Sequence, residues 1–194
     1  MPKQDLTQRT ADLKVTELRA SGGDDKPKKL QGYVNKFNTL SVDLGSFREI
    51  IKPGAFTKSL DSNDIRALYQ HNSSDLLGRT SSNTLTLSED DTGLRFELVL
   101  PDTQLGRDVY TLVERGDLTD MSFGFNVVNA DHRTEDGVDI QEVTEADLHE
   151  ISVVNWGAYP NNDNGSEVLA KRARDQFNQE RKRRMRMRAR LKTI

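Results

Sequence analysis

Three residues that lie far apart in the sequence could together supply the groups of a serine nucleophile system: His71, Ser122 and Glu150. A serine hydroxyl attacks a carbonyl only when a base takes its proton, and an imidazole base needs a third group that fixes its tautomer and stabilises its cation. The chain has no cysteine, which excludes a thiol nucleophile, a disulfide framework and a thiolate metal site. Serine is therefore the leading candidate for covalent catalysis.

Ser122 lies in a segment, residues 120–128, whose apolar residues recur at every second position, a pattern that predicts a β-strand. Ser122 and Gly124 would lie on one face of this strand together with Asn126. The missing side chain at Gly124 would let a bulky substrate approach the Ser122 hydroxyl, although a serine on a solvated face is the alternative. The apolar residues of the strand would share the opposite face: Met121, Phe123, Phe125 and Val127.

His71 ends a second predicted strand, residues 65–71, and is followed by the turn-forming residues 72–75. An imidazole at the end of a strand could act as a general base in a site formed at that edge. A surface histidine beside a turn is the other interpretation, and the sequence of this segment alone leaves both open.

Glu150 and its neighbour His149 lie in a third predicted strand, residues 147–154, which is otherwise rich in apolar residues. Simple alternation predicts one face with Leu148, Glu150, Ser152 and Val154 and the other with His149, Ile151 and Val153. Only one of the two adjacent ionisable residues would then point at a given site. A buried carboxylate needs a hydrogen-bond donor, which an imidazole supplies, and an arginine on a neighbouring strand is the structural alternative.

The rest of the pattern indicates many strands and few helices. Alternation in residues 84–87 and 94–100, with turn-forming residues between them, predicts a hairpin. The spacing of apolar residues predicts a helix over residues 103–115, and residues 137–143 would form a strand that pairs with the one before it. About six or seven strands with two or three helices favour a mainly β, α+β protein, either an antiparallel barrel or a sandwich with added helices.

A length of 194 residues fits one domain with extensions. We expect a flexible N-terminal segment over residues 1–29, a folded domain over residues 30–165 and a basic tail over residues 166–194. No run approaches the roughly 18 apolar residues that span a bilayer, and the N-terminus lacks the apolar segment of a signal peptide. A soluble, intracellular protein with no membrane partner is therefore expected.

Charge is distributed unevenly along the chain. Residues 171–194 hold 11 lysines and arginines against two acidic residues, a local charge of +9, whereas residues 1–170 carry −12. Such a basic run is usually a solvated segment, but it would also attract a nucleic acid or an acidic protein surface.

The sequence resembles the prohead proteases of tailed phages, which mature viral capsids and are distantly similar to the herpesvirus assemblins. The resemblance rests on motifs that occur in the order found in the family: Gly32–Phe37, Glu49–Phe56 with Ser59-Leu60, Gln70–Asn72 with Leu77–Arg79, Met121–Phe125 and Leu148–Val154. These motifs lie between residues 30 and 162, and it is their ordered occurrence together that makes the match specific.

By this resemblance His71 is the general base, Ser122 the nucleophile and Glu150 the third member of a triad. Assemblins have a second histidine as their third member, so His149 stays open as the alternative to Glu150. The resemblance also implies a fold, namely a closed antiparallel β-barrel with peripheral helices, like that of the herpesvirus proteases.

In assemblins the loop after the strand of the third triad residue supplies the oxyanion hole. In this chain that loop would contain Trp156, Gly157, Ala158 and Tyr159, with Gly157 allowing backbone amides to face the developing oxyanion. This stretch departs from the family, because residues 155–160 are longer than the direct run to proline found in many members.

The resemblance implies a serine endopeptidase that cleaves the scaffold segment of the major capsid protein, and itself, inside the prohead that assembles in the host cytoplasm. It implies self-association, no metal or organic cofactor and no obligate nucleic acid, since the protease would act before the genome enters the shell. The other class of function is a non-catalytic capsid or scaffold component whose basic tail binds nucleic acid or an acidic partner.

Overall fold

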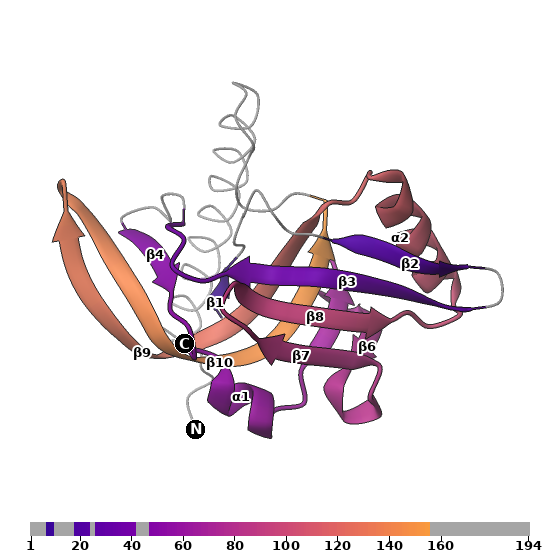
Figure 1. Cartoon of the computed structure of the whole chain (residues 1–194), viewed down its shortest axis with the longest axis horizontal. Coiled ribbons are helices and arrows are strands. Elements are labelled where there is room, and N and C mark those ends of the chain that lie inside the picture. Colours follow the sequence, from indigo (N-terminus) through magenta and orange to yellow (C-terminus); the bar gives the residue numbers. More distant parts are fainter. Residues whose placement is uncertain (1–6, 10–17, 24–25, 42–46, 156–194) are drawn as a thin grey trace, which may run out of the picture. The chain divides into compact units, whose positions relative to one another are not determined.

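The computed structural model describes residues 7–9, 18–23, 26–41 and 47–155, all of which belong to one unit of the chain, residues 1–158 (Figure 1). This described part of the protein is mostly β with few helices, as the sequence predicts. Its described helices are α1 (Thr57–Ser62), α2 (Gln104–Arg115) and a short 3₁₀ turn, η1 (Thr80–Ser82).

A six-stranded sheet is built around its longest strand, β10 (Val138–Val154). On one side β10 pairs along its whole length with the antiparallel strand β9 (Asp120–Glu135). On the other side it pairs in parallel with β4 (Phe47–Ile51) and β5 (Arg66–Tyr69). The remaining strands are β6 (Asn72–Arg79), beside β5, and β1 (Thr7–Arg9), beside β9. Therefore β10 lies between the strand that carries Ser122 and the strand that leads to His71.

A second, antiparallel sheet of four strands has the order β2-β3-β8-β7. Its strands are β2 (Arg19–Gly23), β3 (Lys26–Lys36), β8 (Gly93–Val99) and β7 (Leu85–Glu89). The expected hairpin of residues 84–87 and 94–100 is thereby confirmed as β7 and β8. The expectation of a flexible segment over residues 1–29 differs from the structure, because β2 and the start of β3 lie there. Strand β2 pairs with the first half of β3, and β3 pairs with β8 from Lys29 onward, and composition alone does not report such pairing.

Both sheets contribute to one hydrophobic core, with Phe96 from β8 and Leu148 from β10 among its fully buried members. Phe56, which immediately precedes α1, packs edge-on against Phe123 and Phe125 of β9, with ring centroids 5.9 and 6.2 Å away. The two β9 rings stack on each other at 5.1 Å. The apolar face predicted for residues 120–128 is therefore the core face of β9.

Helix α2 confirms the helix predicted over residues 103–115. Its N-cap is Thr103, whose hydroxyl accepts a hydrogen bond from the amide of Gly106 at 3.1 Å. Gly116 ends the helix in a left-handed conformation with φ of 80°. Residues 117–119 then lead into β9, so the helix delivers the chain to the strand that carries Ser122.

The expected closed antiparallel barrel differs from what the described strands form, which is two separate sheets that are not joined into a barrel. The pairing of β10 with β4 and β5 is parallel, not antiparallel. Strands β4 and β5 lie one after the other along the same side of β10, and α1 lies in the segment that connects them. Alternation within a strand does not report the direction of its partner, so the sequence pattern could not predict these pairs.

An ion pair closes the open end of the β5–β6 hairpin, opposite the turn that carries His71. Arg79 binds Asp64 through two guanidinium nitrogens, one of them Nε at 3.0 Å from Oδ1, and the Ser81 amide donates to the same oxygen at 3.2 Å. The Arg79 guanidinium, with a smaller contribution from Ser81, holds the pKa of Asp64 well below its usual range. A carboxyl group whose pKa is lowered by folding stabilises the protein at pH values above its unfolded-state pKa. This contribution is lost as the pH falls toward the folded-state pKa.

We therefore expect Asp64→Asn to lower the free energy of unfolding at pH 7, and we expect the difference from wild type to shrink as the pH falls below about 4, where an unfolded aspartate takes up its proton. Urea unfolding at pH 7, 4 and 3 measures this difference. The control is Asp61→Asn, which removes an exposed carboxylate of α1. An equal loss of stability at all three pH values would contradict the ion-pair explanation.

Candidate active site

His71 lies in a two-residue turn between β5 and β6, because Tyr69 pairs with Asn72. Gln70 and His71 both have left-handed backbones, with φ of 55° and 56°, as in a type I′ turn. The sequence predicted that His71 would end the strand, whereas β5 ends at Tyr69 and His71 projects from the turn. Residues that carry a side chain are unfavourable in this conformation by about 1–2 kcal/mol each.

Strand β10 holds this strained turn in place. The amide of Gln70 donates to the carbonyl of Val153 at 3.0 Å, and the amide of His71 donates to the hydroxyl of Ser152 at 3.3 Å. Non-glycine residues keep such backbone angles only where their surroundings impose them, and they cluster at functional sites. The position of the His71 ring is therefore set by β10.

The His71 ring meets the carboxylate of Glu150, whose Oε1 lies 2.7 Å from Nδ1. The Glu150 side chain is 9% exposed and that of His71 18% exposed, so water screens the contact poorly. The carboxylate accepts a hydrogen bond from a proton on Nδ1, and in the neutral imidazole this leaves Nε2 with the free lone pair. Nε2 is thus the nitrogen that could take a proton from a nucleophile.

The arginine that lies beside Glu150 on the neighbouring strand binds a different carboxylate. Arg66 of β5 is the register partner of Glu150, yet its guanidinium pairs with Asp64 at 3.6 Å. The carboxylate of Glu150 instead contacts His71 and Ser152. The buried carboxylate of Glu150 therefore has an imidazole and a hydroxyl as hydrogen-bond partners.

A β-bulge at His149 overturns the simple alternation predicted for residues 147–154. Leu148 pairs with Phe125, and Glu150 pairs with the preceding β9 residue, Gly124, so His149 is the extra residue. Leu148 is fully buried in the core and does not share a face with Glu150. One inserted residue shifts a period-two pattern to the opposite face, and the sequence carried no signal for it.

His149 contacts different residues from His71. Its Nε2 lies 2.9 Å from Nδ2 of Asn126 and 3.4 Å from Oδ2 of Asp147. By alternation Asn126 belongs to the same β9 face as Ser122, so the bulge brings both His149 and Glu150 to that face. The prediction that His149 and Glu150 point to opposite faces was wrong because of this bulge. Their contacts distinguish them instead, since Glu150 contacts His71 whereas His149 contacts Asn126 and Asp147.

Gly124 makes room for Glu150. A Cβ atom at position 124 would lie 2.6 Å from Glu150 Oε1 and 3.1 Å from its Cγ, so any side chain there would push the Glu150 carboxylate from its present position. The sequence interpretation was that Gly124 leaves space for a substrate beside Ser122. The structure corrects this interpretation, because the side chain of the acid fills that space.

Ser152 is a member of this cluster that sequence reasoning missed. Its hydroxyl donates to Glu150 Oε2 at 2.6 Å, and the residue is fully buried. Its position two residues after Glu150, as a polar residue in an apolar run, was the available signal.

Ser122 of β9 is the register partner of Ser152 of β10. The neighbouring strands β9, β10 and β5 thus bring Ser122, Glu150 and the His71 turn into one region of the sheet. Ser122 is fully buried, so a peptide substrate must gain access to it before any reaction.

The expected oxyanion residues, Trp156, Gly157, Ala158 and Tyr159, lie outside the described residues, as does the basic tail over residues 166–194. Within the described part of the chain, no group of three or more histidine, aspartate or glutamate side chains is placed to hold a metal ion. No helix in the same part is long and apolar enough to cross a membrane.

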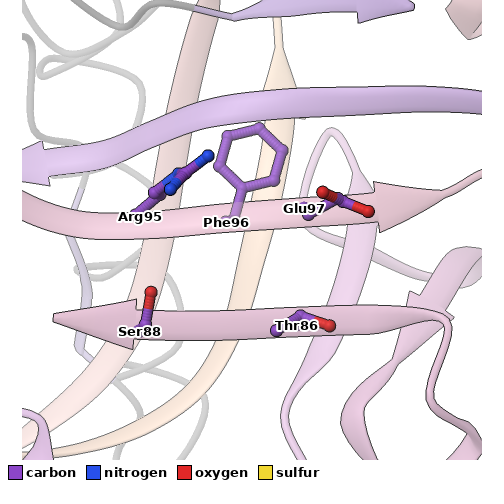
Figure 2. Close-up of a pocket in the computed structure, with 5 residues that line it drawn as sticks. All are labelled: Thr86, Ser88, Arg95, Phe96 and Glu97. Carbon is purple, nitrogen blue, oxygen red and sulfur yellow. The ribbon is translucent and has the colours of Figure 1, made fainter.

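A small hollow of about 150 Å³ lies on the second sheet, apart from the strands that carry the His71 cluster. Figure 2 shows its lining residues on the adjacent strands β7 and β8: Thr86, Ser88, Arg95, Phe96 and Glu97. The hollow is lined mainly by polar side chains and contains neither an imidazole nor a member of the expected triad.

Comparison with known proteins identifies the family of this chain. Neither a curated protein nor a solved structure matches the chain. The model of the family described as caudovirus prohead serine protease matches residues 14–179, which include His71, Ser122 and Glu150. Because this match covers most of the sequence, the chain belongs to the caudovirus prohead serine protease family.

Proposed function

We propose that this chain is a serine endopeptidase that cleaves the scaffold segment of the major capsid protein, and itself, during prohead maturation. Its triad consists of Ser122 as nucleophile, His71 as general base and Glu150 as the residue that orients the base. The observation that carries the proposal is the 2.7 Å contact between Glu150 Oε1 and His71 Nδ1, beside the strand that holds Ser122. This contact fixes the tautomer that a serine protease needs.

In the acylation step, Ser122 Oγ attacks the carbonyl carbon of the scissile peptide while its proton passes to His71 Nε2. The imidazolium that forms keeps its Nδ1 proton in a hydrogen bond to Glu150, whose negative charge stabilises it. When the tetrahedral intermediate collapses, the C–N bond breaks and the leaving amine takes the proton from Nε2. The ester of Ser122 remains.

In the deacylation step, a water molecule gives a proton to His71 Nε2 and attacks the ester carbonyl. The second intermediate expels Ser122 Oγ, which recovers its proton from the imidazolium. The new carboxyl terminus leaves, and Glu150 has held one charge throughout. No metal or organic cofactor takes part in this proposal.

The site of action in this proposal is the assembling prohead in the host cytoplasm, where the partners are the capsid protein, its scaffold segment and other copies of this chain. The folded protease domain would include β2 and β3 and so begin before residue 30, with the basic tail over residues 166–194 as an extension. The family membership supports a role in the prohead. The choice of substrate is our inference.

Co-expression of the full chain with the major capsid protein of the same phage tests the proposal. We expect the capsid protein to be cut into defined fragments, measured as intact masses, and a serine-directed fluorophosphonate to label the protease. If particles assemble while the capsid protein stays uncut and the chain stays unlabelled, the chain is a non-catalytic component of the shell, which is the alternative function.

A further inference from the structure

Ser152 has two hydrogen bonds that connect the base and the acid of the proposed triad. Its hydroxyl donates to Glu150 Oε2 at 2.6 Å and accepts a hydrogen bond from the amide of His71 at 3.3 Å. The other oxygen of the carboxylate, Oε1, contacts the His71 ring. A closed ring of contacts therefore runs from the His71 backbone through Ser152 and Glu150 to the His71 side chain.

We propose that Ser152 is a positioning residue, which sets the orientation of the Glu150 carboxylate and anchors the turn that carries His71; this inference rests on the proposed protease function. A carboxylate with one oxygen held by Ser152 can present only the other oxygen to Nδ1. The amide of His71 belongs to a left-handed turn that needs external restraint. One hydroxyl thus restrains both partners of the proton-transfer pair.

The geometry separates the role of Ser152 from that of Ser122, although the two serines pair across β9 and β10 and both are fully buried. The hydroxyl proton of Ser152 points to a carboxylate oxygen, and its oxygen already accepts the amide of His71. A nucleophile must instead give its proton to an imidazole nitrogen. Ser152 therefore acts through Glu150 and His71 and does not itself attack the substrate.

The test compares wild type, Ser152→Ala and Ser152→Thr, each as the full chain. It measures kcat and KM on a peptide that spans a cleavage site mapped in the capsid protein, and it measures labelling by the serine-directed fluorophosphonate. A hydrogen bond to a charged group accounts for a loss of about 10- to 100-fold in kcat when it is removed, and KM is expected to stay within about twofold. Ser152→Thr keeps the hydroxyl and should recover most of the rate. Ser152→Cys, which retains a weak donor, replaces it if the threonine variant does not fold.

Ser59→Ala is the matched control, because Ser59 is also a buried serine with two hydrogen bonds, from its hydroxyl to the carbonyls of Phe56 and Ala146. It lies in α1 and bonds β10 at Ala146, not at Glu150 or Ser152, so its loss should change thermal stability and leave kcat unchanged. A second readout is the His71 Nδ1 proton in the ¹H NMR spectrum of the ¹⁵N-histidine protein. In Ser152→Ala this proton should exchange faster with water than in wild type and Ser59→Ala.

The proposal is supported if Ser152→Ala loses rate with an unchanged KM, if the threonine variant recovers it and if the label stays on Ser122. It is overturned if Ser152→Ala matches wild type, if threonine gives no recovery, or if the label is found on Ser152. Should wild type neither cleave nor label, the protease function fails. The NMR comparison still decides the positioning role in that case, and an Nδ1 proton unaffected by Ser152→Ala would overturn it.

Discussion

Ser122→Ala is expected to lose at least about 10⁴-fold in kcat for cleavage of the capsid protein and to abolish cleavage of its own chain, since no acyl-enzyme can form without the hydroxyl. The fold should persist. Alanine removes one buried oxygen, and we expect the free energy of unfolding to fall by only about 1 kcal/mol. Fragment formation followed over time by mass spectrometry, together with a thermal melt of each variant, measures both effects.

Ser59→Ala supplies the control for loss of a buried serine, and Ser88→Ala the control for an exposed serine on a strand of the second sheet. Both controls should cleave at the wild-type rate. Cleavage by Ser122→Ala at a rate within tenfold of wild type, on the scale of effects seen for triad nucleophiles, would show that Ser122 is not the nucleophile.

Glu150→Gln is expected to reduce kcat by about 10²- to 10⁴-fold, whereas His149→Ala should stay within about threefold of wild type. Glutamine nearly preserves the shape of the glutamate side chain but removes the charge that stabilises an imidazolium at His71. Its amide group could also turn toward Nδ1 and favour the wrong tautomer. His149 contacts Asn126 and Asp147, and its loss leaves the hydrogen bond between Glu150 and His71 in place.

The two variants should be assayed side by side on the same capsid protein, with melting temperatures to exclude unfolding. A larger loss of kcat in His149→Ala than in Glu150→Gln would transfer the orienting role to His149. A loss in Glu150→Gln that is explained entirely by a lower melting temperature would also count against the triad.

Much of the local structure could be predicted from the sequence because it follows directly from periodicity. The apolar face of residues 120–128, helix α2 and the β7–β8 hairpin each depend on residues that are neighbours in the chain. The contact of Glu150 with an imidazole followed from a different argument, namely the cost of burying a carboxylate without a donor.

What could not be predicted depends on partners that lie far away in the sequence. The bulge at His149 is visible only when β9 and β10 are aligned, because Leu148 and Glu150 meet consecutive residues of the partner strand. The left-handed turn at Gln70 and His71 lacks the glycine or asparagine that normally marks it. Its restraint comes from Ser152 and Val153, about 80 positions later in the chain.

The close approach of Glu150 to Gly124 makes these two positions an epistatic pair. Any residue other than glycine at position 124 places its Cβ atom against the carboxylate, so a substitution there would displace Glu150 from its contact with His71. Aspartate at position 150, one methylene shorter, would withdraw from that clash and equally from His71. The loss of kcat caused by replacing the glycine and shortening the acid together should therefore be smaller than the sum of the losses caused by the separate changes. Along a lineage, the shorter acid should be acquired before the glycine is lost.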